Sequence, residues 1–140
     1  TSARNQLHGQ VSGVRSQGRN DMINLQLAGG LSIEAQITHD STLRLGLEIG
    51  TDVFALIKAG WLELLTPDQS ETIGHNCLTG KVEEILDAED GPSEVRIVLP
   101  SHQILCAVVE ADRLHALQLK AGGAVKVQFA PSNILLGTPL

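Results

Sequence analysis

Aromatic side chains are nearly absent from this chain of 140 residues, which holds one Trp, two Phe and no Tyr. Proteins that bind single-stranded nucleic acid stack the bases on aromatic side chains, and this sequence offers few such platforms. The formal net charge of -6 is also unfavourable, because nucleic-acid-binding surfaces attract phosphates through an excess of Lys and Arg. The composition therefore disfavours a nucleic-acid-binding barrel.

Long hydrophobic runs and cysteines are equally scarce. No stretch reaches the length of about 18 apolar residues that crosses a bilayer, and no signal-peptide pattern is present, so we expect a cytoplasmic protein. Cys77 and Cys106 lack metal-ligand spacing and lie in apolar segments, which favours two buried thiols over a disulfide. Because the chain begins with Thr1 and not Met, we expect a fragment of a longer protein.

An internal repeat is the main feature that the sequence does contain. Residues 5–11 (Asn-Gln-Leu-His-Gly-Gln-Val) are similar to residues 76–82 (Asn-Cys-Leu-Thr-Gly-Lys-Val), and residues 45–50 are similar to residues 117–122. The first pair is offset by 71 residues and the second by 72, so the repeating unit has about 70 residues.

A polar segment over residues 66–72, which contains a Pro, separates the two copies. We therefore predict a first subdomain over residues 1–65, a linker over residues 66–72 and a second subdomain over residues 73–140. A unit of this size buries little apolar surface by itself. Pairing with the sister copy and with a second chain would bury more, so we expect a homodimer.

Each copy is predicted to be mainly β. Residues 31–37 alternate apolar and polar side chains, which is the period of a half-buried strand. Further strands are predicted at residues 7–15, which contain Gly, at residues 22–27 and at the apolar run of residues 53–57, with a tight Gly29-Gly30 hairpin before residue 31. Thr38 and Gly46 have the residue types that begin and end a short helix. This pattern predicts a tandem pair of small OB-like β-barrels, each with one short helix.

Three motifs then occur in order within the first copy. They are residues 1–6 (Thr-Ser-Ala-Arg-Asn-Gln), residues 37–41 (Ile-Thr-His-Asp-Ser) and residues 57–61 (Ile-Lys-Ala-Gly-Trp). Together with the duplication they resemble the Mop (molybdate-binding, or TOBE) family over essentially the whole chain. The tandem arrangement, a di-Mop domain, is similar to the C-terminal half of molybdate-responsive transcription regulators.

The resemblance implies an anion site at a subunit interface. The positions that it assigns to the molybdate ligand are Ser2, Ala3, Arg4, Thr38, Ser41, Lys58 and Ala59. It further implies that the opening motif and the Lys motif come from one chain and the Thr/Ser motif from its partner. Tungstate has nearly the same size and charge and is expected to bind as well.

The chemistry of these residues suits a tetrahedral dianion, which has four acceptor oxygens and no proton to donate. Arg4 and Lys58 balance two negative charges, and the Arg can bind two oxygens at once. The hydroxyl groups of Ser2, Thr38 and Ser41 donate hydrogen bonds, and the helix start is expected to add backbone N–H groups. Ala3 and Ala59 would contribute through their backbones.

The second copy departs from this pattern. Ile73, Gly74 and His75 replace the Ser-Ala-Arg element, Glu110 and Arg113 replace the Thr and Ser, and Ala130 replaces the Lys. We therefore expect only the first copy's motifs to bind the anion, in a site shared between the first copies of two chains, with the second copy as a packing partner.

Catalysis and cation binding find little support in the sequence. The five His residues lack metal-ligand spacing, and the acidic residues between Glu83 and Asp90 are expected to form a solvated strand and hairpin tip. No phosphate loop, nucleophile elbow or zinc motif is present, so we expect a binding protein and not an enzyme. Trp61 is interpreted as a packing residue at a repeat or subunit contact.

The leading hypothesis is the sensor domain of a molybdate-dependent transcription regulator, which would bind DNA only through an N-terminal winged helix-turn-helix domain. A molybdate storage protein is the alternative, distinguished by several anions per chain and a higher oligomer. A third possibility is the accessory domain of an ABC-transporter ATPase, which a Walker motif upstream would reveal.

Overall fold

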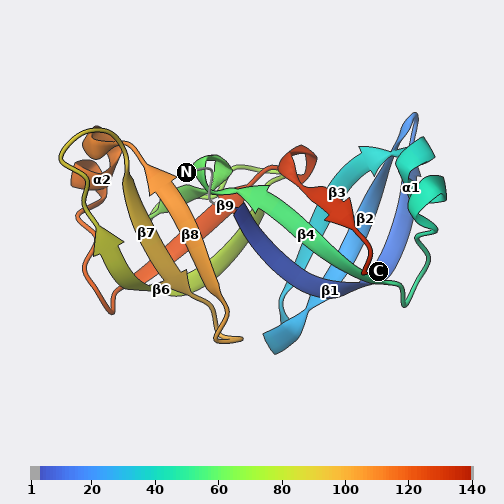
Figure 1. Ribbon diagram of the computed structural model, residues 1–140, viewed down its shortest axis with the longest axis horizontal. Coiled ribbons are helices and arrows are strands. Elements are labelled where there is room, and N and C mark those ends of the chain that lie inside the picture. The colour runs from blue at the N-terminus through green and yellow to red at the C-terminus, as the bar shows by residue number, and fades with distance from the viewer. Residues whose placement is uncertain (1–3, 140) are drawn as a thin grey trace. The chain divides into compact units, whose positions relative to one another are not determined.

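The computed structural model describes residues 4–139 and contains two five-stranded sheets with the same internal order (Figure 1). The first sheet runs β10-β4-β1-β2-β3 and the second runs β5-β9-β6-β7-β8. The strands are β1 (Arg4–Gln17), β2 (Asn20–Leu27), β3 (Ser32–Thr38), β4 (Asp52–Lys58), β5 (Glu63–Leu65), β6 (Asn76–Leu86), β7 (Ser93–Val98), β8 (Ile104–Val109), β9 (Ala124–Phe129) and β10 (Leu135–Gly137).

Each sheet is accompanied by one short α-helix and by 3-10 turns. The helices are α1 (His39–Leu45) and α2 (Ala111–Leu117), and the turns are η1 (Ala28–Gly30), η2 (Ala59–Trp61) and η3 (Pro131–Asn133). The first and last strands of each sheet contact each other, β10 with β3 and β5 with β8, so each sheet curls into a barrel. The predicted fold class, mainly β with one short helix in each barrel, is confirmed.

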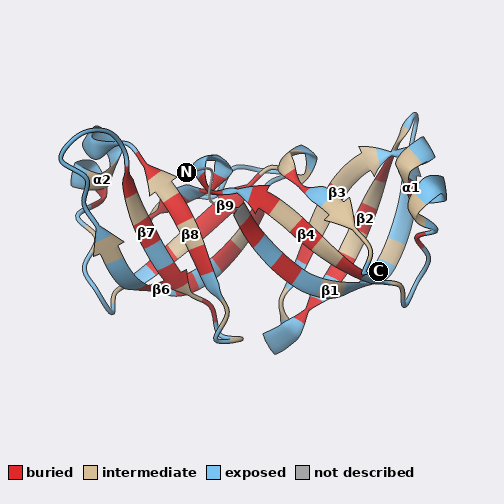
Figure 2. Ribbon diagram, viewed as in Figure 1, coloured by how far each residue is buried: buried red, intermediate tan, exposed pale blue. Residues whose placement is uncertain are grey.

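Each barrel has its own apolar core, formed by the inward-facing residues at alternate positions of the strands (Figure 2). Fully buried positions recur in the two copies at the same places. In the first copy these are Ile23, Leu25, Ile33, Ala35, Val53 and Ala55, and in the second they are Val95, Ile97, Leu105, Ala107, Val125 and Val127. The repeated pattern of buried residues explains why both copies adopt one strand order.

A glycine shared by the two copies is required by close strand packing. A Cβ at Gly9 would lie 2.7 Å from the carbonyl oxygen of Gln26, and one at Gly80 would lie 2.7 Å from that of Val98. Real Cβ atoms essentially never approach a backbone oxygen so closely. The repeated Gly therefore marks a place where β1 and β6 leave no room for a side chain against the backbone of β2 and β7, respectively.

The helix in the first copy begins and ends where the sequence predicts. Thr38 is the N-cap, and Gly46 ends the helix in the left-handed conformation with φ 65°. The predicted two-residue hairpin at Gly29-Gly30 is wrong in detail. Both glycines adopt positive φ, but they belong to the 3-10 turn η1, and the Leu27 amide donates to the Leu31 carbonyl across a longer connection.

Each compact unit of the structure is built from two segments of the chain. One unit contains the described residues up to Asn5 together with residues 58–129, and the other contains residues 6–57 together with the described residues from Ala130 onward. The short strand β5 of the first copy pairs with β9 of the second, and β10 of the second pairs with β4 of the first. The two copies have therefore exchanged their last strands.

The described residues include no helix with the length and apolar character needed to span a membrane.

Candidate functional site

The site residues expected from the sequence are distributed over three segments of the structure. Ser2 and Ala3 lie outside the described residues, and Arg4 is the first residue of β1. Thr38 and Ser41 lie at the start of α1, Lys58 is the last residue of β4, and Ala59 is the first residue of η2.

Thr38 and Ser41 form a close pair at the start of α1. The Ser41 amide donates to Oγ1 of Thr38 at 3.1 Å, and the two hydroxyl oxygens lie 2.8 Å apart. When the Ser41 hydroxyl donates across this contact, both lone pairs of the Thr38 oxygen are occupied and its own hydrogen remains available. In this arrangement the pair can present one hydroxyl donor to a ligand.

The backbone at this helix start offers fewer donors than the sequence suggested. The His39 amide donates to the Arg19 carbonyl at 2.9 Å, and the Ser41 amide is already bound to Thr38. Two of the first amides of α1 are therefore engaged within the chain. The side-chain hydroxyls, and not a full set of helix amides, are what this segment can present to a ligand.

Charges around the pair are balanced locally. Asp40 lies between Thr38 and Ser41 in the sequence, and its carboxylate accepts from the Arg44 guanidinium at 2.8 Å. A small hollow of about 210 Å³ adjoins Ser41 and is lined by Arg44, Leu45 and Leu136. The Asp40–Arg44 pair reduces the repulsion that an isolated carboxylate would exert on an anion at this position.

A buried carboxylate supports the same helix start from inside the barrel. Asp21 in β2 is 1% exposed, and its Oδ2 lies 2.9 Å from Nδ1 of His39. Hydrogen bonding from Thr42 and from His39 holds the pKa of the Asp21 carboxyl below its ordinary value. At the corresponding positions, the second copy has Ser93, Ala111 and Leu114, so this support exists only in the copy that carries the Thr/Ser pair.

Lys58 and Trp61 contact each other across η2. The Lys58 ammonium lies 4.8 Å from the centre of the Trp61 ring, which is cation–π distance. Ala59 between them is buried, and η2 packs against strand β8. Trp61 thus has a local partner that the sequence did not indicate. Its ring can orient the Lys58 side chain through this contact.

The start of β1 is hydrogen-bonded to strand β8 as well. The Asn5 carboxamide donates from Nδ2 to the Cys106 carbonyl at 2.9 Å, and its Oδ1 accepts from the Cys106 amide at 2.7 Å. The opening motif, through Asn5, and the segment that carries Lys58 are therefore brought together on one strand, although they are far apart in the sequence.

The Thr38–Ser41 pair belongs to a different compact unit. Arg4 and Lys58 fall in the unit built around β5 to β9, whereas Thr38 and Ser41 fall in the unit built around β1 to β4. The structure thus places in one unit the two motifs that the resemblance assigns to one chain of a site.

The corresponding positions of the second copy make other contacts. Glu110 is the N-cap of α2 but makes no side-chain capping hydrogen bond. Arg113 donates to the Leu64 carbonyl at 3.0 Å, and Ala130 precedes η3. A carboxylate, a guanidinium that binds backbone and a methyl group do not form a set of donors for an anion.

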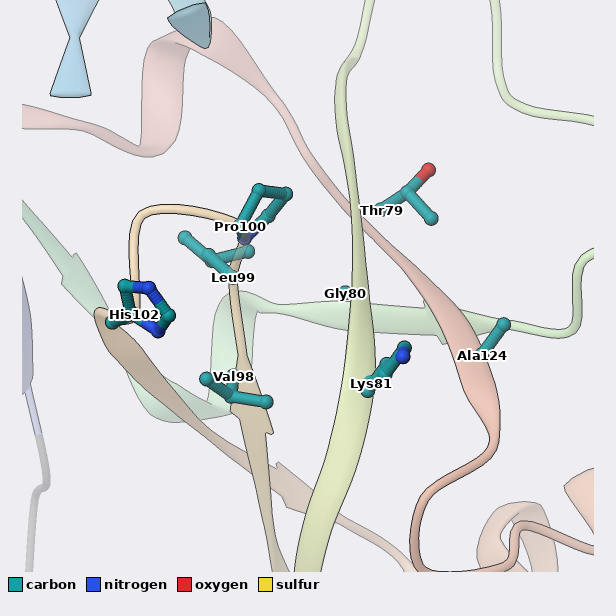
Figure 3. Close-up of a pocket in the computed structure, with 8 residues that line it drawn as sticks. All are labelled: Thr79, Gly80, Lys81, Val98, Leu99, Pro100, His102 and Ala124. Carbon is teal, nitrogen blue, oxygen red and sulfur yellow. The ribbon is translucent and has the colours of Figure 1, made fainter. Parts of the chain in front are cut away.

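A larger groove lies elsewhere and has the wrong chemistry for an anion (Figure 3). Its volume is about 410 Å³, and it lies on the second barrel beside the connection between β7 and β8. The lining residues are Thr79, Gly80, Lys81, Val98, Leu99, Pro100, His102 and Ala124. None of the predicted site residues that the structure describes is among them, and Lys81 is the permanently charged residue of this lining.

Cation binding and thiol chemistry find no site in the described part of the chain. Within residues 4–139 no cluster of His, Cys, Asp and Glu could hold a metal ion. Cys77 and Cys106 are free thiols, half-buried and not fully buried as expected. Burial raises the pKa of both thiols, so the reactive thiolate is disfavoured at neutral pH.

Comparison with known proteins gives one family. The family model of the TOBE domain matches residues 1–64 and 73–136, which are the two copies of the repeat. The chain is 37% identical over 139 residues to the transcriptional regulator ModE of Yersinia pestis and 34% identical over 142 residues to the molybdenum-pterin-binding protein MopA of Rhodobacter capsulatus. These matches cover 99% of this chain and 52% of each relative, so the chain spans about half their length.

A solved structure has nearly the same fold. The cytoplasmic molybdate-binding protein ModG, determined with molybdate bound, superposes with a TM-score of 0.92 at 31% sequence identity. The superposition covers 99% of both chains, so the similarity includes both copies and their exchanged strands.

Proposed function

Because the chain belongs to the TOBE domain family, we propose that it binds the molybdate dianion, or tungstate, as the sensor domain of a molybdate-responsive transcription regulator. It acts by binding and not by catalysis. In the regulator, a separate N-terminal domain would bind DNA. A regulator of this kind works in the cytoplasm.

The observation that carries this proposal is the convergence of two motif segments on strand β8. Asn5 follows Arg4 directly and is bonded to Cys106, while Lys58 lies beside η2, which packs on the same strand. Arg4 and Lys58, which belong to these two segments, carry two positive charges that match the two charges of the anion. The opening motif is thereby hydrogen-bonded to the same strand against which the Lys motif packs.

A second chain would supply the remaining donors. Thr38 and Ser41 present hydroxyl groups from the other compact unit, and the sequence resemblance assigns them to a partner chain. A site completed by two chains is occupied only when the chains are correctly juxtaposed. Molybdate would therefore shift the population towards one dimer arrangement, which is a physical route to control of DNA binding.

A stand-alone molybdate-binding protein is the second candidate. It is favoured by the match to ModG, which covers 99% of both chains. The sensor is favoured by the loss of donors at Glu110, Arg113 and Ala130 in the second copy, which leaves one set of site residues per chain. The stoichiometry of binding separates the two candidates.

Isothermal titration calorimetry of the chain with sodium molybdate tests the proposal. We expect one anion per chain, and we expect Arg4→Ala and Lys58→Ala each to weaken binding by about tenfold or more, because each removes a charge-assisted hydrogen bond. Lys81→Ala, which removes a cation from the groove on the second barrel, is the matched control and should bind like the wild type.

Wild-type affinity in both site variants would show that the site lies elsewhere. More than one anion per chain at comparable affinity would favour the stand-alone binding protein. Absence of any heat from molybdate or tungstate would contradict the proposed ligand.

A further inference from the structure

Asn5 belongs to the opening motif but is not among the residues assigned to the anion, and its side chain is directed into the protein. We propose that Asn5 is a positioning residue for the anion site, which fastens the opening motif of the first copy to strand β8 of the second. This role rests on the proposed function, since it concerns the same site.

The Asn5 side chain makes the two hydrogen bonds that the backbone of a neighbouring strand would make. Its carboxamide bonds to both the N–H and the C=O of Cys106, at 2.7 Å and 2.9 Å, and Asn5 is only 4% exposed. Strand β8 ends the order of its sheet, so its outer backbone groups need partners. One side chain thus satisfies an edge residue in the way that a neighbouring backbone would.

The chemistry of the contact selects Asn at this position. A carboxamide carries one donor and one acceptor on the same carbon, which matches the acceptor and donor of one backbone residue. The carboxylate of an Asp would place a second acceptor against the Cys106 carbonyl. An aliphatic side chain would leave the amide and the carbonyl without their partner, at a cost of about 1–3 kcal/mol for each unsatisfied group.

The two hydrogen bonds between Asn5 and Cys106, called the Asn5 clamp below, act on the anion site because of where Asn5 lies in the sequence. It directly follows Arg4, so the point where β1 is fastened lies one residue from the guanidinium that balances the anion. The other charged residue, Lys58, is held beside the same strand by the packing of η2. The Asn5 bonds and the packing of η2 therefore attach the opening motif and the Lys motif to the same strand, which favours a preorganised site.

The repeat provides a matched control. Asn76 occupies the corresponding position of the second copy and is also buried, at 9% exposure. The residues before it are Ile73, Gly74 and His75, which do not repeat the Ser-Ala-Arg element. If buried Asn served only to stabilise the fold, Asn5 and Asn76 would be equivalent. If Asn5 positions the site, only its loss weakens anion binding.

The test compares Asn5→Ala, Asn5→Asp and Asn76→Ala with the wild type by calorimetric titration with sodium molybdate and by thermal unfolding. We expect both Ala variants to lose stability, whereas only the Asn5 variants weaken molybdate binding, by about tenfold. The rate of hydrogen exchange at the Cys106 amide measures directly whether its hydrogen bond to the residue 5 side chain is present. We expect exchange to accelerate in Asn5→Ala and to stay slow in Asn5→Asp, whose carboxylate still accepts the amide hydrogen bond.

A double-mutant cycle tests whether the loss of Asn5 weakens anion binding through Arg4. If Asn5 acts by placing the opening motif, Asn5→Ala and Arg4→Ala together weaken binding by less than the product of their separate factors. Wild-type affinity in a folded Asn5→Ala, an equal loss of affinity in Asn76→Ala, or independent effects in the cycle would each overturn the positioning role. If the wild type binds neither molybdate nor tungstate, the proposed function fails instead, which is a different result.

Discussion

Asp21 combines nearly complete burial with a carboxylate that His39 and Thr42 stabilise in its charged form. Its pKa is lowered from the ordinary value of 3.8, with Thr42 the larger cause and His39 the next. A carboxyl group whose pKa is lower in the folded state stabilises the fold above the unfolded pKa, and this contribution is lost as the pH falls through the folded pKa. The Asp21–His39 contact is therefore expected to weaken in acid.

We predict that Asp21→Asn makes unfolding less dependent on acid. As the pH falls from about 5 to about 2, the thermal unfolding midpoint of the wild type should decrease more steeply than that of the variant, because only the wild type loses the charged carboxylate. Asp87→Asn, at an exposed position, controls for the change in net charge. Parallel pH profiles for wild type and Asp21→Asn would refute this expectation.

Trp61 is predicted to act on the anion through Lys58. Its ring lies 4.8 Å from the ammonium, and a cation–π contact at an exposed site contributes about 0.5–1 kcal/mol. We expect Trp61→Ala to weaken molybdate binding by about two- to fivefold, the equivalent of that energy, and Trp61→Phe to retain most of the affinity.

Calorimetry of the two Trp61 variants gives this measurement, with Asn133→Ala as control because Asn133 is the equivalent residue of the second copy. A loss of binding in Trp61→Ala as large as that in Lys58→Ala would mean that Trp61 contributes more than orientation.

The residue types of the site were predictable from the sequence, whereas their local partners were not. Arg4, Lys58, Thr38 and Ser41 carry donors whose chemistry is readable without a structure. The partner of Asn5 lies 101 residues away, so no local pattern indicates it. The available signal was the recurrence of Asn at residue 76, at the same place of the second copy, since a polar residue kept in both copies of a core strand needs a partner.

At the scale of single elements, the N-terminus of α1 is capped by a side-chain hydrogen bond and that of α2 is not. The Thr38 side chain accepts from the Ser41 amide, whereas Glu110 makes no such bond. We predict that Thr38→Ala lowers the free energy of unfolding by about 1 kcal/mol, the usual contribution of an N-cap, and that Glu110→Ala has little effect. Urea unfolding of both variants, with Thr38→Ser as the variant that retains the cap, measures this difference.

Equal losses of stability in Thr38→Ala and Glu110→Ala would show that the capping bond contributes nothing. Retained stability in Thr38→Ser together with reduced stability in Thr38→Ala would support the assigned bond.

The boundaries of α1 were predictable because capping is local chemistry. Thr38 and Gly46 act through contacts within a few residues, so sequence spacing is sufficient. The connection at Gly29 and Gly30 was predicted less well. Two glycines allow positive φ in several kinds of turn, and the choice between them depends on how β2 and β3 align, which a short segment does not determine.

At the scale of the whole molecule, the exchange of last strands makes the two copies interdependent. The sheet of the first copy includes β10, and the sheet of the second includes β5. A fragment ending at residue 65 would lack β10 beside β4, and its own β5 would lack β9. We predict that residues 1–65 do not form a stable folded monomer, because an unpaired edge and exposed apolar core remain.

Co-expression of fragments 1–65 and 66–140 tests this. We expect a complex with one copy of each fragment, detected by mass and by circular dichroism that matches the intact chain, since each fragment supplies the strand that the other lacks. A well-folded monomer of residues 1–65 alone would contradict the interdependence of the copies.

The strand exchange itself was beyond sequence reasoning. The repeat correctly indicated two similar barrels, because alternation at residues such as Ile33 and Ala35 recurs in the second copy. The two short strands β5 and β10 occupy equivalent places in their copies, however, so either could fit either sheet. Only the length and path of the connecting segments decide the pairing, and those are properties of the folded chain.

The exchanged strands also suggest how such a chain could have arisen. In the product of a gene that encoded a single copy, the β5-like strand could pair with the sheet of a second such product, so that two products would exchange strands. Joining two genes of this kind end to end would preserve the traded arrangement within one polypeptide. The fused halves would then be free to diverge, one keeping residues such as Lys58 and the other replacing them, without either losing the strand that closes its barrel.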